Sequence, residues 1–331
     1  MAIGSLFIWL ALRGVNWADI ADVFSSINPL ILLGYFFLLV VIHLCRVVRW
    51  GILLKPLGQV SFGRLFMVSS VGMMALVLLP LRLGEFARPL LISEPGKIRA
   101  SSALATIVVE RLIDSLAMAL LLVVILFLIK DRIVVPAEIN YWAWVVLIGF
   151  ILLLGLLMVA YWRQEATVWR FRRVVGIFSQ KAAQRLGSIL DSFISGLRAL
   201  PNLKLVISFL ALTGIIWFVT GVGHWYAFRA FDDLAQLGLM EAFTVLAVLC
   251  VGLMIPAGPG MIGNFHYFVK LGLSLFVSDA VLGSSGVAYA LLVHAMSLGQ
   301  QVLFGLPFLF HPQISVRRIL FASRKMEAAG E

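Results

Sequence analysis

Long apolar runs alternate with short polar segments along most of the chain. Five of these runs are close to or longer than the roughly 20 residues that an α-helix needs to cross a bilayer. They are Pro29–Cys45, Ser101–Ile129, Tyr141–Tyr161, Leu203–Phe228 and Val281–Phe310. Tryptophans stand near the ends of several runs, where aromatic membrane anchors are expected. The pattern predicts an all-α integral membrane protein, a polytopic helix bundle.

Two further apolar runs are interrupted by proline and glycine. Phe62–Pro80 breaks at PLRLGEFARPLL, and Met240–Pro256 breaks at PAGPGMIGNFHYF. Broken backbone at membrane depth persists only where protein or a wet cavity satisfies it. We therefore predict two re-entrant helical hairpins, the alternative being two ordinary helices joined by a tight turn. The residues at the breaks are Pro80, Gly84, Pro256, Gly258, Gly260 and Gly263.

The basic residues favour the re-entrant interpretation. If Ser61–Arg99 enters and leaves on one face, the great majority of Lys and Arg residues collect on that face. The opposite face keeps only Arg13, Lys130, Arg132, Arg229 and Lys270. Short cytoplasmic loops carry an excess of Lys and Arg. The basic loops and the C-terminus are therefore predicted to be cytoplasmic.

The order of elements repeats in two halves of one transmembrane domain, residues 1–331. Half one (about 29–130) and half two (about 203–310) each read helix, broken hairpin, helix. With the hairpins entering from opposite faces, this predicts an inverted repeat, whose substrate site lies where the repeats meet. Coincidence of the breaks is the alternative. Residues 1–12 suggest a short first helix, and 311–331 form a basic tail.

Residues 163–202 form a basic segment between the halves. Apolar residues recur there at steps of three or four from Phe171 to Leu197, which predicts an amphipathic helix on the membrane surface or beneath the bundle. Basic side chains expected to face lipid headgroups are Arg46, Arg49, Arg172 and Arg173. The alternative for them is the general excess of positive charge on a cytoplasmic face.

Composition supports lipid as part of the solvent. The chain is 62% hydrophobic and 13% charged, whereas soluble domains are about 45–50% apolar. Its net charge of +10 fits cytoplasmic loops, so we expect no nucleic-acid partner. Cys45 and Cys250 lie in apolar runs without metal-ligand spacing, so neither a disulfide, a metal nor another cofactor is predicted.

Charged residues inside an apolar helix are the strongest chemical signal. Glu110, Arg111 and Asp114 lie roughly 14–20 Å from the helix start, near the bilayer midplane. Each charge costs about 2.5–3.5 kcal/mol there when it faces lipid. Glu85 and Arg88, just beyond the first break, are the predicted partners. The network either lines a cavity for a polar headgroup or only fastens the hairpin to the helix.

The second break is followed by Asn264, His266 and Lys270, which complete the predicted headgroup cavity. The helix that begins near Ile262 could direct its N-terminal amides at an anion such as phosphate. His224 and His294 lie alone in long apolar helices. Each is either a hydrogen-bonded packing residue or a proton carrier.

Two motifs resemble a known family. LPLRLGEFARPLLIS followed by ALATIVVERLIDSLAMALLL resembles the transmembrane region of lysylphosphatidylglycerol synthases, in which Pro-x-x-x-G-E-x-x-R precedes E-R-x-x-D. An upstream R-x-x-R-W (Arg46, Arg49, Trp50) and the late Pro-x-x-x-G break fit as well. The resemblance implies a flippase-like domain of a bacterial inner membrane. His266 stands where a carboxylate is expected, which puts the substrate in doubt.

The resemblance implies transport of lipids with polar headgroups between leaflets. Candidates are aminoacyl-phosphatidylglycerol, other phospholipids and polyprenyl-phosphate carriers. Because no aminoacyltransferase domain follows, we expect no lipid synthesis by this chain and no enzymatic activity. Alternatives are a membrane-embedded lipid-modifying transferase and an accessory subunit of a separate lipid synthase. Expected partners are membrane lipids, such a synthase and further copies of the chain.

Overall fold

A computed structural model describes residues 6–7, 9–10, 22–25, 27–79, 84–94, 97–130, 137–197, 202–255, 259–312 and 314. Its helices are α3 (Pro29–Leu54), α4 (Phe62–Leu78), α5 (Ala87–Ile92), α6 (Ala100–Ile129), α7 (Ala137–Trp162), α8 (Gln164–Gly176), α9 (Gln180–Leu197), α10 (Leu203–Phe228), α11 (Leu239–Gly252), η2 (Pro259–Met261), α12 (Asn264–Leu273), α13 (Asp279–Val281), η3 (Leu282–Gly286), α14 (Val287–Gly305) and η4 (Leu306–Phe310). Within these ranges, five segments are long and apolar enough to cross a membrane. The predicted all-α polytopic fold is confirmed.

The predicted spans agree with the helices at most boundaries. Helix α10 has the predicted bounds, and α6 begins one residue earlier than expected. Helix α3 is the exception, because it continues past Cys45 to Leu54. Falling hydropathy at Arg46 and Arg49 suggested an end there, but Arg49 is paired and buried inside the protein. The predicted helix in residues 1–12 falls largely outside the described residues.

The segment between the halves forms two helices rather than the single amphipathic helix predicted. Helices α8 and α9 pack against each other, and the chain turns at residues 177–179. The backbone N–H of Ile177 bonds to Val174 O, which tightens the end of α8, and Ser179 Oγ accepts from Ala182 N at the start of α9. These interactions favour a turn over a continuous helix, and Phe178 at the turn is exposed.

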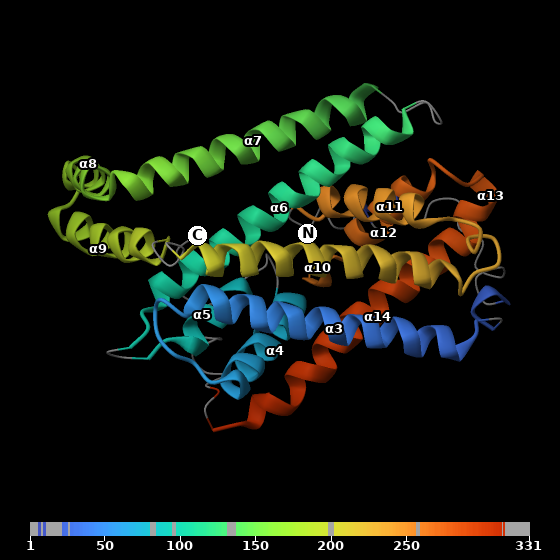
Figure 1. Ribbon diagram of the computed structural model, residues 1–331, viewed down its shortest axis with the longest axis horizontal. Helices are drawn as coiled ribbons and strands as arrows, with labels where there is room; N and C mark the ends of the chain where they lie inside the picture. The colour runs from blue at the N-terminus through green and yellow to red at the C-terminus, as the bar shows by residue number, and fades with distance from the viewer. Residues whose placement is uncertain are drawn as a thin grey trace.

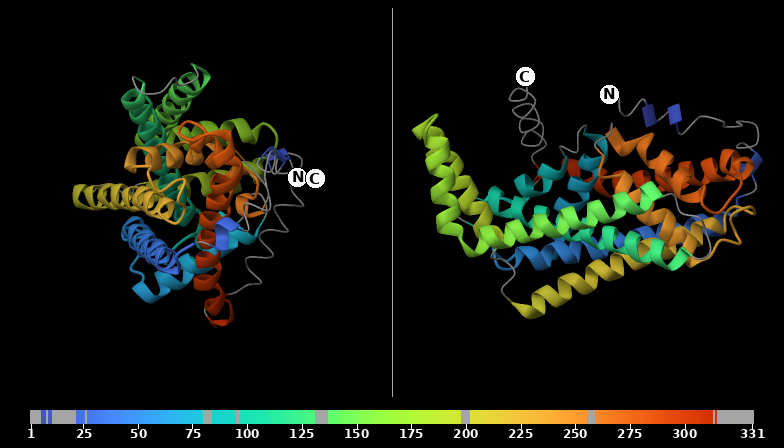
Figure 2. Two further views of the ribbon diagram at one scale, coloured as in Figure 1. Left: turned by 90° about the vertical axis from the view of Figure 1, so that its right-hand side faces the viewer. Right: turned by 90° about the horizontal axis from the view of Figure 1, so that it is seen from above.

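Helices α3 and α10 lie side by side through the middle of the bundle (Figure 1). Helices α4 and α5 form a hairpin that packs on α6. The open end of this hairpin lies against α9, because Arg99 Nη1 donates to Ser192 Oγ at 3.1 Å and Ser102 Oγ donates to Ser192 O at 3.0 Å. The hairpin therefore begins and ends at the end of the bundle that carries α8 and α9 (Figures 1 and 2).

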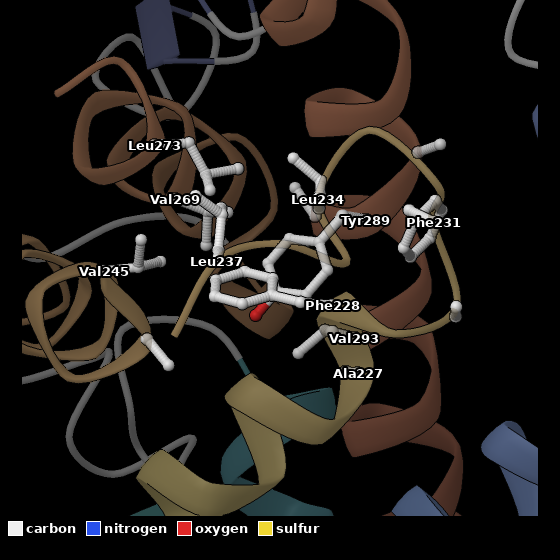
Figure 3. Close-up of a cluster of buried hydrophobic side chains, with 14 of the residues drawn as sticks. Ala227, Phe228, Phe231, Leu234, Leu237, Val245, Val269, Leu273, Tyr289 and Val293 are labelled. Atoms are coloured by element: carbon white, nitrogen blue, oxygen red, sulfur yellow. The ribbon is translucent and has the colours of Figure 1, made fainter. Parts of the chain in front are cut away.

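Helices α11 and α12 form a second hairpin whose open end lies at the opposite end of the bundle. There, Ser285 Oγ donates to Asp233 Oδ2 at 2.6 Å. An apolar cluster joins this hairpin to the neighbouring ends of α10 and α14 (Figure 3). Its members include Phe228, Phe231, Leu234, Leu237, Val245, Val269, Leu273 and Tyr289. The cluster therefore packs the second hairpin against α10 and α14.

The main contacts between the two halves are symmetric: each has an equivalent in which every helix is replaced by its counterpart from the other half. Helix α3 packs on its counterpart α10, the first hairpin packs on α14 through α4, and the second packs on α6 through α11. Each hairpin thus lies against the last long helix of the other half. The two hairpins also meet, because the end of α4 contacts η2. This symmetry is the property expected of two repeats related by a pseudo-twofold axis.

Candidate functional site

A cluster of five charged side chains lies where α3, α5 and α6 meet. Arg49 reaches Asp114 with two hydrogen bonds, Nη1 to Oδ1 at 2.6 Å and Nη2 to Oδ2 at 2.9 Å. Arg88 reaches Glu110 with two longer contacts of 3.3 and 3.4 Å. Arg111 Nη2 lies 2.6 Å from Glu110 Oε1 and 3.3 Å from Asp114 Oδ2. These contacts join residues up to 65 positions apart in the chain.

Glu110 is the centre of this cluster. Its side chain is fully buried, and three guanidinium groups surround it, those of Arg49, Arg88 and Arg111. Removing one partner from a buried group of this kind is strongly destabilising, because it leaves an uncompensated charge at low dielectric. The cluster therefore fastens α3, α5 and α6 together, one of the two roles proposed for it.

Neighbouring side chains complete the cluster. Thr213 and Trp217 of α10 bond to Arg49 and Asp114 at 3.1 Å each. Trp50 Nε1 donates to Thr106 Oγ1 at 3.1 Å. The Arg88 guanidinium lies over the Trp50 ring, 5.3 Å from the ring centroid. These partners come from α3, α6 and α10, and the sequence pattern did not indicate Thr213 or Trp217. Arg49, predicted to face lipid headgroups, is instead buried in this cluster.

Glycine makes room for the cluster at the first hairpin. A Cβ atom on Gly72 of α4 would lie 2.2 Å from Arg88 Cγ, so the Arg88 stem occupies the space beside that glycine. A Cβ on Gly84 would lie 2.1 Å from Leu76 N, so the turn approaches the α4 backbone directly. Glu85 is half-buried and interacts electrostatically with Arg111. The Arg111 side chain, 34% exposed, forms the accessible edge of the cluster.

The second hairpin is closed by polar side chains of α12. Asn264 is fully buried, and its Nδ2 donates to Gly252 O at 2.9 Å and to Ile255 O at 3.1 Å. Gly252 is the last residue of α11 and Ile255 lies three residues beyond it, in a region where backbone carbonyls lack intrahelical partners, although Gly252 O also accepts from Ile255 N at 3.1 Å. Gly260 and Gly263 have positive φ, which favours glycine. Lys270 is half-buried near the end of α12.

Two histidines continue this hydrogen bonding from α12 to α14. Gly263 N donates to His266 Nδ1 at 3.3 Å, His266 Nε2 lies 3.4 Å from His294 Nδ1, and His294 Nε2 lies 2.8 Å from Gly260 O. A carbonyl only accepts, so His294 carries its proton on Nε2, and His266 must then donate from Nε2. The chain of donors returns to the glycine turn and holds it against α14. His224 bonds to the Tyr289 hydroxyl at 2.6 Å.

Replacing Asn264 with alanine is expected to destabilise the second hairpin. The buried Gly252 O would keep only the backbone N–H of Ile255, and Ile255 O would lose the Asn264 donor, which together cost about 1–3 kcal/mol. The change is measured as a lower apparent melting temperature of purified protein. Asn202→Ala is the matched control, because Asn202 caps the exposed start of α10 through Lys204 N, and losing such a cap costs about 1 kcal/mol. An equal or smaller shift for Asn264→Ala would contradict this role.

A cavity of about 220 Å³ lies between the two hairpins. Its wall comes from α3, α4, α10, α11, α12 and α14, together with the η2 turn. The volume far exceeds the roughly 10–15 Å³ that one water molecule requires. Its polar lining consists of Tyr35, His43, Arg46, Trp217, Thr220, His224, His294, Ser297, Gln300 and Gln301.

The cavity and the charge cluster are neighbours rather than one site. Of the predicted headgroup-site residues, only Arg46 and Gly260 line this cavity. Trp217 joins the two, because it lines the cavity and donates to Asp114. Arg172 and Arg173 are exposed on α8, with Arg172 lying over Gly187 of α9 and Arg173 beside the Trp169 ring. Pro80, Pro256 and Gly258 lie outside the described residues.

Comparison with known proteins identifies one relationship. The sequence model of a family described as the lysylphosphatidylglycerol synthase TM region matches residues 1–305. No curated protein and no solved structure matches the chain.

Proposed function

We propose that this chain, which belongs to the family of lysylphosphatidylglycerol synthase transmembrane regions, moves a lipid with a polar headgroup between the two leaflets of its membrane. The proposed activity is that of a flippase- or scramblase-like transporter in a bacterial inner membrane. The lipid classes considered are aminoacyl-phosphatidylglycerol, other phospholipids and polyprenyl-phosphate carriers. No GxxxxGK[ST] phosphate-binding loop is present in the sequence, so transport would be downhill or coupled to an ion gradient.

The cavity between the hairpins carries the proposal. Transfer of a polar headgroup into an apolar environment without hydrogen bonds costs several kcal/mol, which is the barrier to spontaneous exchange. The cavity offers hydrogen-bonding groups from both halves of the chain, for example Arg46 of α3 and Gln300 of α14. A headgroup held there would keep its polar partners while its tails remain in lipid.

The arrangement of the halves supports the same proposal. Transporters built from inverted repeats place their site where discontinuous helices of the two repeats meet. In this chain the end of α4 contacts η2, and both border the cavity. Alternating access would follow from small movements of one hairpin against the other.

We further propose that both hairpins are re-entrant. Helices α4 and α11 have 17 and 14 residues, which is short of the roughly 20 residues of a spanning helix. Each hairpin opens toward one end of the bundle, and the end with α8 and α9 carries Arg64, Lys97 and Arg99. That end would be cytoplasmic by the positive-inside rule.

Filling the cavity tests this function. Ser297 of α14 lines the cavity, so Ser297→Phe should place a ring inside it and lower the rate of lipid exchange at least about tenfold. Exchange is measured with purified protein in liposomes that contain labelled phospholipids or polyprenyl phosphates. Gly299→Phe is the matched control on the same helix, because a Cβ atom added at Gly299 meets no described atom within 4 Å and Gly299 does not line the cavity.

The comparison is made with variant protein that remains monodisperse after purification, so that a change in exchange rate does not reflect misfolding. Equal rates for Ser297→Phe and wild type would exclude the cavity as the path of the headgroup. If the wild type moves no lipid beyond empty liposomes under any ion gradient, the transporter proposal fails, and an accessory role beside a lipid synthase becomes the better explanation.

A further inference from the structure

The two arginines of α3 lie in different environments, Arg49 in the charge cluster and Arg46 at the cavity. Arg46 and Arg49 lie about one helical turn apart. The two terminal nitrogens of Arg49 are engaged in the cluster, where they contact Asp114 and Glu110. Arg46 borders the cavity, and among the described residues it forms no contact ion pair and no side-chain hydrogen bond. Its guanidinium group therefore has hydrogen-bond donors to offer to a guest.

Two other cavity residues have unpaired polar atoms. His43 is 1% exposed and Gln300 5% exposed, and both line the cavity. Neither His43 Nδ1 nor Gln300 Nε2 has a hydrogen-bond partner among the described residues. His43 Nε2 lies 2.9 Å from Ser70 Oγ. When that hydroxyl donates to Nε2, Nδ1 carries the proton and becomes a donor. Buried polar groups without partners are uncommon and call for an explanation.

The charge cluster beside the cavity has a positive excess when Arg46 is counted with it. Arg46, Arg49, Arg88 and Arg111 face the carboxylates of Glu110 and Asp114, with Glu85 acting on Arg111 from its edge. Among the described residues, four positive charges thus meet three negative ones. A cation without a partner at membrane depth is unfavourable, so an anionic guest would balance it, whereas a cationic guest would add to it.

We infer that the cavity takes a lipid with an anionic, phosphate-bearing headgroup, with Arg46 as its ion partner and His43 and Gln300 as hydrogen-bond donors. This inference rests on the proposed lipid transport and names its substrate class. Phosphate oxygens accept several hydrogen bonds, and charge-assisted bonds from arginine are the strongest of these. Tyr35 lies 11 residues before Arg46 on the same helix, so the cavity wall extends about 16 Å along α3. This length leaves space beyond the phosphate for the rest of the headgroup.

Lipid retention by the full-length protein tests the inference. The protein is purified in nanodiscs with equal amounts of phosphatidylglycerol, phosphatidylcholine and lysyl-phosphatidylglycerol, and the bound lipids are counted by native mass spectrometry. Wild type should retain phosphatidylglycerol over the other two. Arg46→Gln should lower this preference about tenfold, since a lost charge-assisted bond exceeds 1.4 kcal/mol, whereas Arg46→Lys should keep most of it.

The control variant is Arg229→Gln. Arg229 caps α10, lies 4.5 Å from the Trp225 ring centroid and does not border the cavity. It should leave retention unchanged. Excess inorganic phosphate should not displace the lipid, and displacement would show that the site takes free phosphate instead. If Arg46→Gln fails to fold, Gln300→Leu decides, because unchanged preference in that variant would overturn the inference.

Leaflet exchange of the same three lipids separates this inference from the proposed function. Exchange of phosphatidylglycerol that depends on Arg46 supports both. Retention that depends on Arg46 without any exchange keeps the anion site and overturns transport. Exchange of lysyl-phosphatidylglycerol at the rate of phosphatidylglycerol, unaffected by Arg46→Gln, keeps transport and overturns the anionic substrate.

Discussion

Replacing Glu110 with glutamine should destabilise the protein by about 3–5 kcal/mol, the usual cost of breaking a buried ion pair. The carboxylate is fully buried, and it is the shared partner of Arg49, Arg88 and Arg111. A neutral amide of the same shape would remove the carboxylate that all three cations share, and it would leave Asp114 to balance Arg49 and Arg111, with Glu85 acting on Arg111 from the edge of the cluster. The loss is measured as a lower free energy of unfolding in bicelles, or as a lower yield of monodisperse protein.

Glu94→Gln is the matched control for this change. Glu94 pairs with Arg64 and Lys97 at the end of the first hairpin, and its side chain is 30% exposed. Pairs that remain in water are worth at most about 1 kcal/mol. If Glu110→Gln folds as well as this control and loses only lipid exchange, the cluster acts in transport and its fastening role is wrong.

Replacing Gly84 with alanine should displace the turn of the first hairpin. The added Cβ would lie 2.1 Å from Leu76 N and 2.2 Å from Ala75 C, and backbone cannot give way as a flexible side chain can. Overpacking of this kind costs about 1–3 kcal/mol or more. Because the turn also positions Glu85 near Arg111 and lies close to the cavity wall at Leu76, lipid exchange should fall as well. Melting temperature and exchange rate are measured together.

Gly149→Ala supplies a control of opposite sign. Gly149 lies within α7, where an added Cβ meets no described atom within 4 Å. Alanine in a helix is favoured over glycine by about 0.5–1 kcal/mol, so this variant should be slightly more stable than wild type. Equal effects of the two substitutions would show that the close approach of Gly84 to α4 does not determine stability.

Hydropathy predicted the long helices well because lipid imposes a simple requirement on them. A segment such as α10 must be apolar over its whole length, and its ends follow from composition alone. The method failed at α3, where Arg46 and Arg49 lower the hydropathy although the helix continues. The partner of Arg49, Asp114, is distant in sequence, and no local pattern indicates a pair separated by 65 residues.

The sequence indicated those site residues whose side chains are most unfavourable in lipid. Charges such as Glu110 and Arg111 are unusual enough inside an apolar helix to be recognised from the sequence. Neutral polar residues such as His43 and Gln300 are not, because one of them in a span is compatible with ordinary packing. Their meaning comes from the cavity, which forms only when α3 and α14 are brought together.

The symmetry of the contacts between the halves has a consequence for synthesis. Helix α6, which packs against the second hairpin, is synthesised before α11. Helix α14, which packs against the first hairpin, is the last long helix to be synthesised. Close packing of Gly305 on Met74 and Ser70 is therefore among the last steps of assembly. Such contacts between distant parts of a chain form slowly. Before α14 is synthesised, the first hairpin lacks its packing partner, so the α4 surface that α14 later covers is exposed. A membrane chaperone would be expected to bind the nascent protein at this stage.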